Sequence, residues 1–194
     1  MMTDSAQPVW NSLEIIKIIA SLLTPVLILV FGIWVTQIVE RFKASIWANQ
    51  KVVEKRIEIY DELAPLLNDI YCYFYFVGNW KELSPRQVID IKRTVDKKVF
   101  VYSPLFSPQF LDVYQEFIRL TFEHYVGAGL DARLRTSADR YDDRRSSFPG
   151  QWDSSWDRMF SAPGEQSDQD AVRKAYEKLM ATFSSELGIV GKTV

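Results

Sequence analysis

The longest uncharged stretch of the chain runs from Ile18 to Val39, 22 residues without a single Asp, Glu, Lys or Arg. With a rise of about 1.5 Å per residue, a helix of this length covers roughly 33 Å, more than the ~30 Å hydrocarbon core of a bilayer. A buried helix of a soluble domain rarely needs so long a run. We therefore expect a transmembrane helix at residues 18–39, preceded by a short extracytoplasmic N-terminus at residues 1–17.

A cleaved signal peptide is the main alternative, and the sequence around the apolar run argues against it. The run is longer than the apolar region of about 7–15 residues that signal peptides carry. Asp4 and Glu14 precede it in place of a basic cluster, and no small-x-small cleavage site follows. The run is therefore interpreted as a permanent anchor, with the lipid bilayer as the first expected partner.

Basic residues lie almost entirely after the span. Residues 40–59 carry five Lys or Arg side chains, whereas Lys17 is the only one before the span. Because Lys and Arg accumulate on the cytoplasmic side, the N-terminus is expected outside and residues 40–194 in the cytoplasm. Cys72 is the only cysteine, which agrees with a reducing compartment.

Small and hydroxylated residues of the span gather on one side of the expected helix. Four of the five Ala, Gly, Ser and Thr residues between 18 and 39 lie within about 60° of Ser21 around the helix axis, given 3.6 residues per turn, and only Ala20 lies outside this sector. The face consists of Ser21, Thr24, Pro25, Ile28, Gly32 and Thr36. Such a face lets membrane helices approach closely, so it predicts a homo-oligomer in which these residues form the interface or line a narrow pore. Pro25 is tolerated there because a neighbouring helix or Ser21 can satisfy the carbonyl that the proline frees.

Residues 40–194 show helical periodicity throughout. The expected helices cover residues 42–64, 66–80, 85–101, 108–126 and 167–187. Pro65 separates the first two, and Gly78-Asn79 is expected to cap the second. Ser84-Pro85 and Ser107-Pro108 are typical helix starts. The predicted fold class is all-α, with one N-terminal transmembrane helix continuing into a cytoplasmic helical bundle. Asn49 is either buried in an oligomer, where it fixes register, or exposed in a juxtamembrane turn.

A loop-rich segment at residues 130–166 interrupts the helical pattern. It is rich in arginine, and Trp152, Trp156 and Phe160 recur every four residues, which predicts one short amphipathic helix. Two interpretations stay open: these aromatics cap the core of the bundle, or the segment is a docking surface for another chain or a nucleotide. The candidate partner-binding residues are Arg140, Arg144, Arg145, Trp152 and Trp156.

Catalytic motifs are missing from the sequence. One histidine and one cysteine cannot form a zinc site of the usual His/Cys type. The chain has neither GxxxxGK[ST] nor GxGxxG, and its paired carboxylates have no informative spacing. We therefore expect no enzyme activity, no cofactor and no metal site.

One part of the sequence resembles a known group. The string from Tyr60 to Cys72, followed by Val77-Gly78-Asn79-Trp80 and the two Ser-Pro helix starts, resembles uncharacterised bacterial single-pass membrane proteins. The layout is similar to that of small membrane effectors of anti-phage defence systems. The resemblance implies a homo-oligomeric effector, possibly one that forms a channel, that perturbs the bacterial inner membrane when a cytoplasmic protein or a nucleotide signal triggers it. It carries over no site residues.

A second function class remains open beside the effector. The protein is alternatively a membrane-tethered adaptor, whose cytoplasmic bundle recruits a protein partner and whose anchor only localises it. The small-residue face of the span favours the effector. The lack of charge in the span argues against a wide hydrated pore and leaves the adaptor open.

Overall fold

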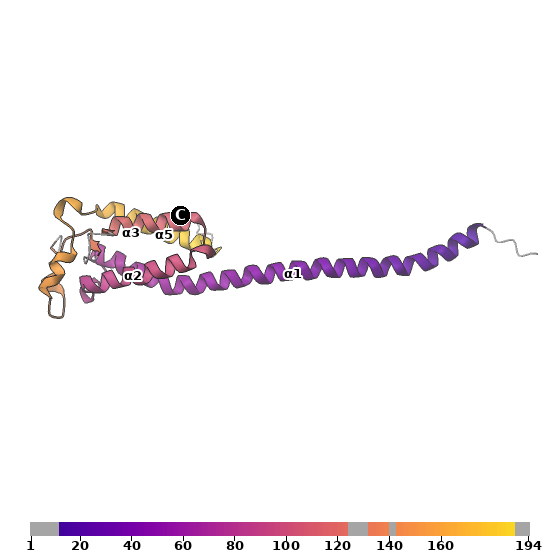
Figure 1. Cartoon of the computed structure of the whole chain (residues 1–194), viewed down its shortest axis with the longest axis horizontal. Coiled ribbons are helices and arrows are strands. Elements are labelled where there is room, and N and C mark those ends of the chain that lie inside the picture. Colours follow the sequence, from indigo (N-terminus) through magenta and orange to yellow (C-terminus); the bar gives the residue numbers. More distant parts are fainter. Residues whose placement is uncertain (1–11, 124–131, 140–142, 189–194) are drawn as a thin grey trace, which may run out of the picture. The chain divides into compact units, whose positions relative to one another are not determined.

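The computed structural model describes residues 12–123, 132–139 and 143–188 of the chain (Figure 1). The five α-helices found in these residues are α1 (Ser12–Tyr75), α2 (Pro85–Tyr102), α3 (Pro108–Thr121), α4 (Arg144–Ser147) and α5 (Gln169–Glu186). Short 3₁₀ helices are η1 (Trp80–Glu82), η2 (Ser103–Leu105), η3 (Ser154–Met159) and η4 (Pro163–Glu165). Strands β1 (Phe122–Glu123) and β2 (Arg133–Leu134) form one small antiparallel pair. The predicted all-α class is confirmed.

The chain divides into two compact units, residues 1–51 and residues 52–194. In the first unit, α1 contains the apolar window Ile15–Lys43, 29 residues with a mean hydropathy of 2.6 and no buried residue. By length and composition this helix is able to cross a membrane. Asn49 is exposed and helical, so the juxtamembrane turn expected as one alternative does not form at this residue.

In the second unit, the rest of α1 provides one wall of the core. Its buried residues follow a spacing of three and four: Ile59, Leu63, Leu67, Ile70 and Phe74. The predicted break at Pro65 is wrong, because α1 continues through it to Tyr75. Pro65 lies on the exposed side of the helix, where water can hydrate the carbonyl that it frees. Burial of Leu63 and Leu67 on either side of the proline holds the helix together.

The C-terminus of α1 differs from the predicted cap at Gly78-Asn79. The helix ends at Tyr75, and Phe76 takes the left-handed conformation with φ of 59°. The amide of Val77 donates to the carbonyl of Cys72 at 3.2 Å, which closes the helix in the way a C-terminal glycine usually does. Gly78 also has a positive φ, of 62°, and a Cβ there would lie 3.1 Å from the sulfur of Cys72. The left-handed conformation of Phe76 therefore ends the helix at Tyr75, before the predicted cap at Gly78-Asn79.

The starts of the other long helices follow local sequence. Ser84 and Gln87 form the predicted capping box, with the Ser84 amide donating to Gln87 Oε1 at 2.8 Å. Ser107 Oγ accepts from the amide of Phe110 at 3.3 Å at the start of α3. Asp168, and not Ser167, caps α5 by accepting from the amide of Ala171 at 3.0 Å. These caps satisfy amides that have no partner within the helix.

Packing of α3 and α5 against α1 and α2 encloses the core (Figure 1). Phe183 of α5 lies at the centre of an aromatic group, with ring centroids 4.9 Å from Tyr60 and 4.7 Å from Phe110. The prediction that α3 runs to Val126 is wrong, because the helix ends at Thr121 and Phe122 becomes extended to pair with Leu134. Residues 124–126 lie outside the described residues.

Candidate functional site

The small-residue face of the span is exposed along its whole length. Its hydroxyl groups donate to carbonyls of the same helix: Ser21 to Ile18 at 2.8 Å, Thr24 to Ala20 at 2.7 Å and Thr36 to Gly32 at 2.8 Å. Their oxygen atoms keep lone pairs that can accept a hydrogen bond from a neighbour. The structure places Pro25 and Ile28 in the same exposed stretch of α1.

At two positions on this face, α1 leaves either a backbone carbonyl without its usual helical donor or open space beside the backbone. Pro25 has no N–H, so it cannot donate to the carbonyl of Ser21 one turn earlier. The Ser21 hydroxyl was expected to help, but it donates to Ile18. A Cβ added to Gly32 would meet no atom within 4 Å. Nothing in the described chain therefore requires a glycine at this position, whereas close approach of another helix would.

Arg144 was expected on a docking surface, and the structure corrects this. The residue is only 2% exposed, and its guanidinium lies 4.6 Å from the ring centroid of Tyr73 and 3.9 Å from that of Phe76. Nη2 donates to the carbonyl of Tyr73 at 2.8 Å, and Nη1 donates to the carbonyl of Ser137. Because Tyr73 is in the last turn of α1, Arg144 satisfies a free helix carbonyl and opposes the negative end of the helix dipole. It therefore holds the loop segment to the end of α1.

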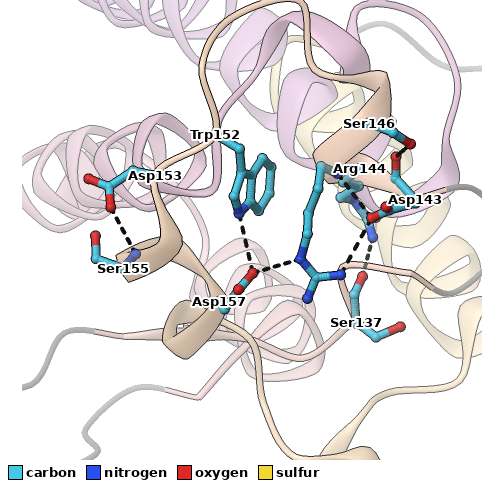
Figure 2. Close-up of polar contacts among 9 residues, drawn as sticks. Ser137, Asp143, Arg144, Ser146, Trp152, Asp153, Ser155 and Asp157 are labelled. Atoms are coloured by element: carbon cyan, nitrogen blue, oxygen red, sulfur yellow. Dashed lines mark hydrogen bonds and ion pairs between the residues drawn. The ribbon is translucent and has the colours of Figure 1, made fainter.

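Arg145 lies on the surface beside Asp157, and Figure 2 shows the indole of Trp152 directed at the same carboxylate. The Nε of Arg145 donates to Asp157 Oδ1 at 2.9 Å, and the indole of Trp152 donates to the same oxygen at 3.2 Å. The hydrogen bond to Asp157 raises the pKa of the Arg145 guanidinium, so the cation is present at all ordinary pH values. Asp143 lies 3.5 Å from the same guanidinium. The cluster of Arg145, Asp157 and Trp152 is thus already arranged before any partner binds.

The aromatic residues of the loop segment divide between two roles. Phe160 packs against the main core and forms a bridge with Leu134, whereas Trp152 and Trp156 are half-buried beside Phe148. The short helix predicted here forms only over Ser154–Met159, and it is the 3₁₀ helix η3 rather than a helix with the four-residue spacing of the aromatics. Asp153 caps it by accepting from the amide of Ser155 at 2.8 Å. Phe160 therefore caps the core of the bundle, as the first interpretation predicts. Trp152 and Trp156 remain candidates for the docking surface. Arg140 lies outside the described residues.

A buried polar group between α2 and α3 was missed at the sequence level. Lys92 donates to Asp96 at 2.6 Å, and the hydroxyl of Tyr114 donates to the other oxygen of Asp96 at 2.5 Å. Burial, with the Asp96 charge beside it, raises the pKa of Tyr114 well above its ordinary value. A signal was present, because Lys92 falls in the buried series of Val88, Val95 and Val99. The group borders a cavity of about 370 Å³.

Reactive or metal-binding groups do not gather in the described residues. No cluster of three or more His, Cys, Asp or Glu side chains able to hold a metal ion is found there. Cys72 is buried, which raises the pKa of its thiol and disfavours the nucleophilic thiolate. His124 lies outside the described residues.

Comparison of the chain with protein-family models, with curated proteins and with solved structures finds no match. The resemblance to membrane effectors accordingly stays a prediction.

Proposed function

We propose that the protein is a single-pass membrane protein that acts as a homo-oligomeric effector on the membrane it spans. The observation that carries this proposal is the fully exposed apolar window Ile15–Lys43. In water, such a surface would have to be covered, because exposed apolar patches of this size drive association. A bilayer covers it without any further protein.

The excess of Lys and Arg after the span supports a cytoplasmic location for the helical unit. A reporter that is active only in the cytoplasm, fused after Val194, is expected to be active. A reporter that is active only in the periplasm is expected to be silent at the same site. The reverse pattern would overturn the orientation, and recovery of the full chain in the soluble fraction would overturn the span itself.

Self-association through the small-residue face is supported by Gly32 and by the Ser21 carbonyl that Pro25 leaves without its helical donor. Gly32→Leu places a branched side chain where two backbones are expected to approach. We expect it to weaken association in membranes by about 1–2 kcal/mol, measured by cross-linking as a function of protein-to-lipid ratio. Val30→Ile, an exchange of one aliphatic for another about 180° from Ser21 on the opposite side of the helix, is the matched control. Equal cross-linking of both variants and the parent would remove this face as the interface.

The effector role itself concerns what the oligomer does to the bilayer. We propose membrane perturbation, with channel formation as its most direct form, in the bacterial inner membrane and in anti-phage defence as the resemblance implies. The proposed trigger is a cytoplasmic protein or a nucleotide signal. Expression of the parent chain is expected to slow growth and to release ions or dye from cells, and Gly32→Leu is expected to relieve both effects.

A membrane-tethered adaptor is the second candidate function. The observation that favours it is the preformed surface cluster of Arg145, Asp157 and Trp152, since Trp and Arg dominate binding hot spots. An adaptor predicts normal growth and no leakage on expression. It also predicts a cytoplasmic partner whose recovery with the chain is lost in Trp152→Ala and retained in Lys174→Ala, on the exposed side of α5.

A further inference from the structure

The C-terminal half of α2 presents an apolar pair on the surface of the helical unit. Phe100 is 55% exposed and Val101 is 60% exposed, more than any other large apolar side chain among the described residues of the helical unit. Two hollows flank the pair. One, of about 470 Å³, includes Arg93, Lys97 and Val101 in its lining, and the other, of about 370 Å³, includes Phe100 and Arg119. We name Arg93, Lys97, Phe100 and Val101 the α2 ridge.

The charge around the ridge is positive and partly uncompensated. Within the described part of the chain, neither Lys97 nor Arg119 forms an ion pair. Arg93 pairs with Asp90 at 2.9 Å, and Lys98 pairs with Glu62. Asp96, the acidic residue that lines one of the hollows, is already bound by Lys92 and Tyr114. Segments that bind to the surface of anionic membranes typically combine exposed apolar side chains with Lys or Arg that have no acidic partner.

The chain itself places the ridge close to the start of the helical unit. Lys55, three residues after that unit begins, lies over the ring of Tyr102 at 5.4 Å, and Tyr102 follows Val101 directly. Only residues 44–51 separate the apolar window from the unit. Eight residues reach at most roughly 28 Å even when extended. A bilayer spanned by the window is therefore present at high effective concentration for the ridge.

We propose that the α2 ridge binds the anionic lipid surface of the same bilayer, with Phe100 and Val101 entering the headgroup region and Lys97 and Arg119 facing lipid phosphates. This inference rests on the proposed membrane span. Anionic lipid is favoured over a protein partner because the free cations flank the apolar pair on both sides and because the chain carries its own bilayer anchor.

The test uses the full chain in lipid vesicles. Cys72→Ala with Val101→Cys carries an environment-sensitive fluorophore, and the vesicles contain a phospholipid with a quencher near its headgroup. Quenching is expected in vesicles that contain phosphatidylglycerol and to be weak in pure phosphatidylcholine. Lys97→Glu is expected to reduce docking at least about fivefold. Lys174→Glu, the same charge reversal on α5, is expected to leave it unchanged.

A second measurement needs no cysteine replacement. In the parent chain, Lys97 is expected to be protected from amine acetylation in phosphatidylglycerol vesicles, whereas Lys174 is expected to react equally in both lipids. An unquenched Val101 probe and a reactive Lys97 in both lipids would overturn the inference. Protection that is equal in both lipids and falls as the protein is diluted into excess vesicles would also overturn it, because a second copy would then cover the ridge.

Extraction at alkaline pH separates this inference from the proposed span. A chain that stays in the vesicles while its ridge remains exposed disproves lipid docking and leaves the span intact. A chain that is stripped from the vesicles disproves both.

Discussion

Residues 18–39 and the helical unit at residues 52–194 use the same kind of side chain in opposite ways. Leu22 and Leu23 of the span are both more than half exposed, whereas Leu63 and Leu67 of the helical unit are completely buried. In the span, apolar residues lie on every side of the helix. In the helical unit, the buried apolar residues of α1 lie along one side of the helix. In the span, composition therefore matters more than position. In the helical unit, each apolar position has specific neighbours, so a change of size is felt locally.

The sharpest test of this difference removes the same side chain from both regions. Phe183→Ala deletes a ring that contacts Tyr60, Phe106 and Phe110, and it is expected to lower the free energy of unfolding by about 3–5 kcal/mol. Phe31→Ala deletes the same atoms from the exposed surface of the span and is expected to leave the unfolding of the helical unit unchanged. Denaturant unfolding in detergent, followed by circular dichroism, measures both. An equal loss in the two variants would contradict the comparison.

The next largest effect separates two adjacent arginines inside the helical unit. Arg144→Ala leaves the carbonyls of Tyr73 and Ser137 without their donor and is expected to cost about 2–4 kcal/mol. Arg144→Lys is not expected to restore stability. An ammonium group has no flat face to pack on the rings of Tyr73 and Phe76, and it does not present two fixed N–H groups to the two carbonyls. Arg145→Ala removes an exposed ion pair and is expected to cost at most about 1 kcal/mol. Similar unfolding midpoints for the two alanine variants would show that Arg144 is not structural.

Alkaline pH should destabilise the helical unit through Tyr114, which is buried, and Tyr176, which is half-buried. Burial raises the pKa of Tyr114 above 10.0 and that of Tyr176 to about 12, so folding favours the protonated phenols. Their contribution is fully present below the ordinary tyrosine pKa and is lost as the pH rises above it. Tyr114→Phe is expected to cost about 1 kcal/mol at neutral pH and to flatten the loss of stability on the alkaline side. A free energy of unfolding for the parent that stays constant up to about pH 11 would refute this assignment.

The smallest expected effect lies in the span. Thr24→Val keeps the shape of the side chain and removes a hydroxyl that donates to Ala20 of its own helix. The proton of that hydroxyl is not available to a second helix, so association is expected to weaken by less than about 1 kcal/mol. Cross-linking in membranes beside Gly32→Leu measures the difference. A loss larger than that of Gly32→Leu would mean that the Thr24 oxygen, rather than close backbone approach, holds the oligomer.

Local sequence was sufficient for the apolar window and for the starts of α2 and α3. The window needs only composition and length, and the caps at Ser84 and Ser107 need only the few residues that follow them. These features depend on contacts within about one helical turn, so a linear pattern contains the relevant information. The cap of α5 was misplaced by one residue because Ser167 and Asp168 are both good cap residues.

Tertiary structure decided where helices end and which polar residues are interior. Continuation of α1 through Pro65, its end at Tyr75, and the change at Phe122 from helix to strand all depend on partners distant in sequence. The same holds for the burial of Arg144 against Tyr73, 71 positions away, and for the joining of Asp96 to Tyr114. The sequence by itself determined an apolar helix long enough to cross a membrane, followed by helices of which two have marked starts. Only three-dimensional packing decided the rest, because burial and the pairing of polar groups depend on neighbours that the local pattern does not contain.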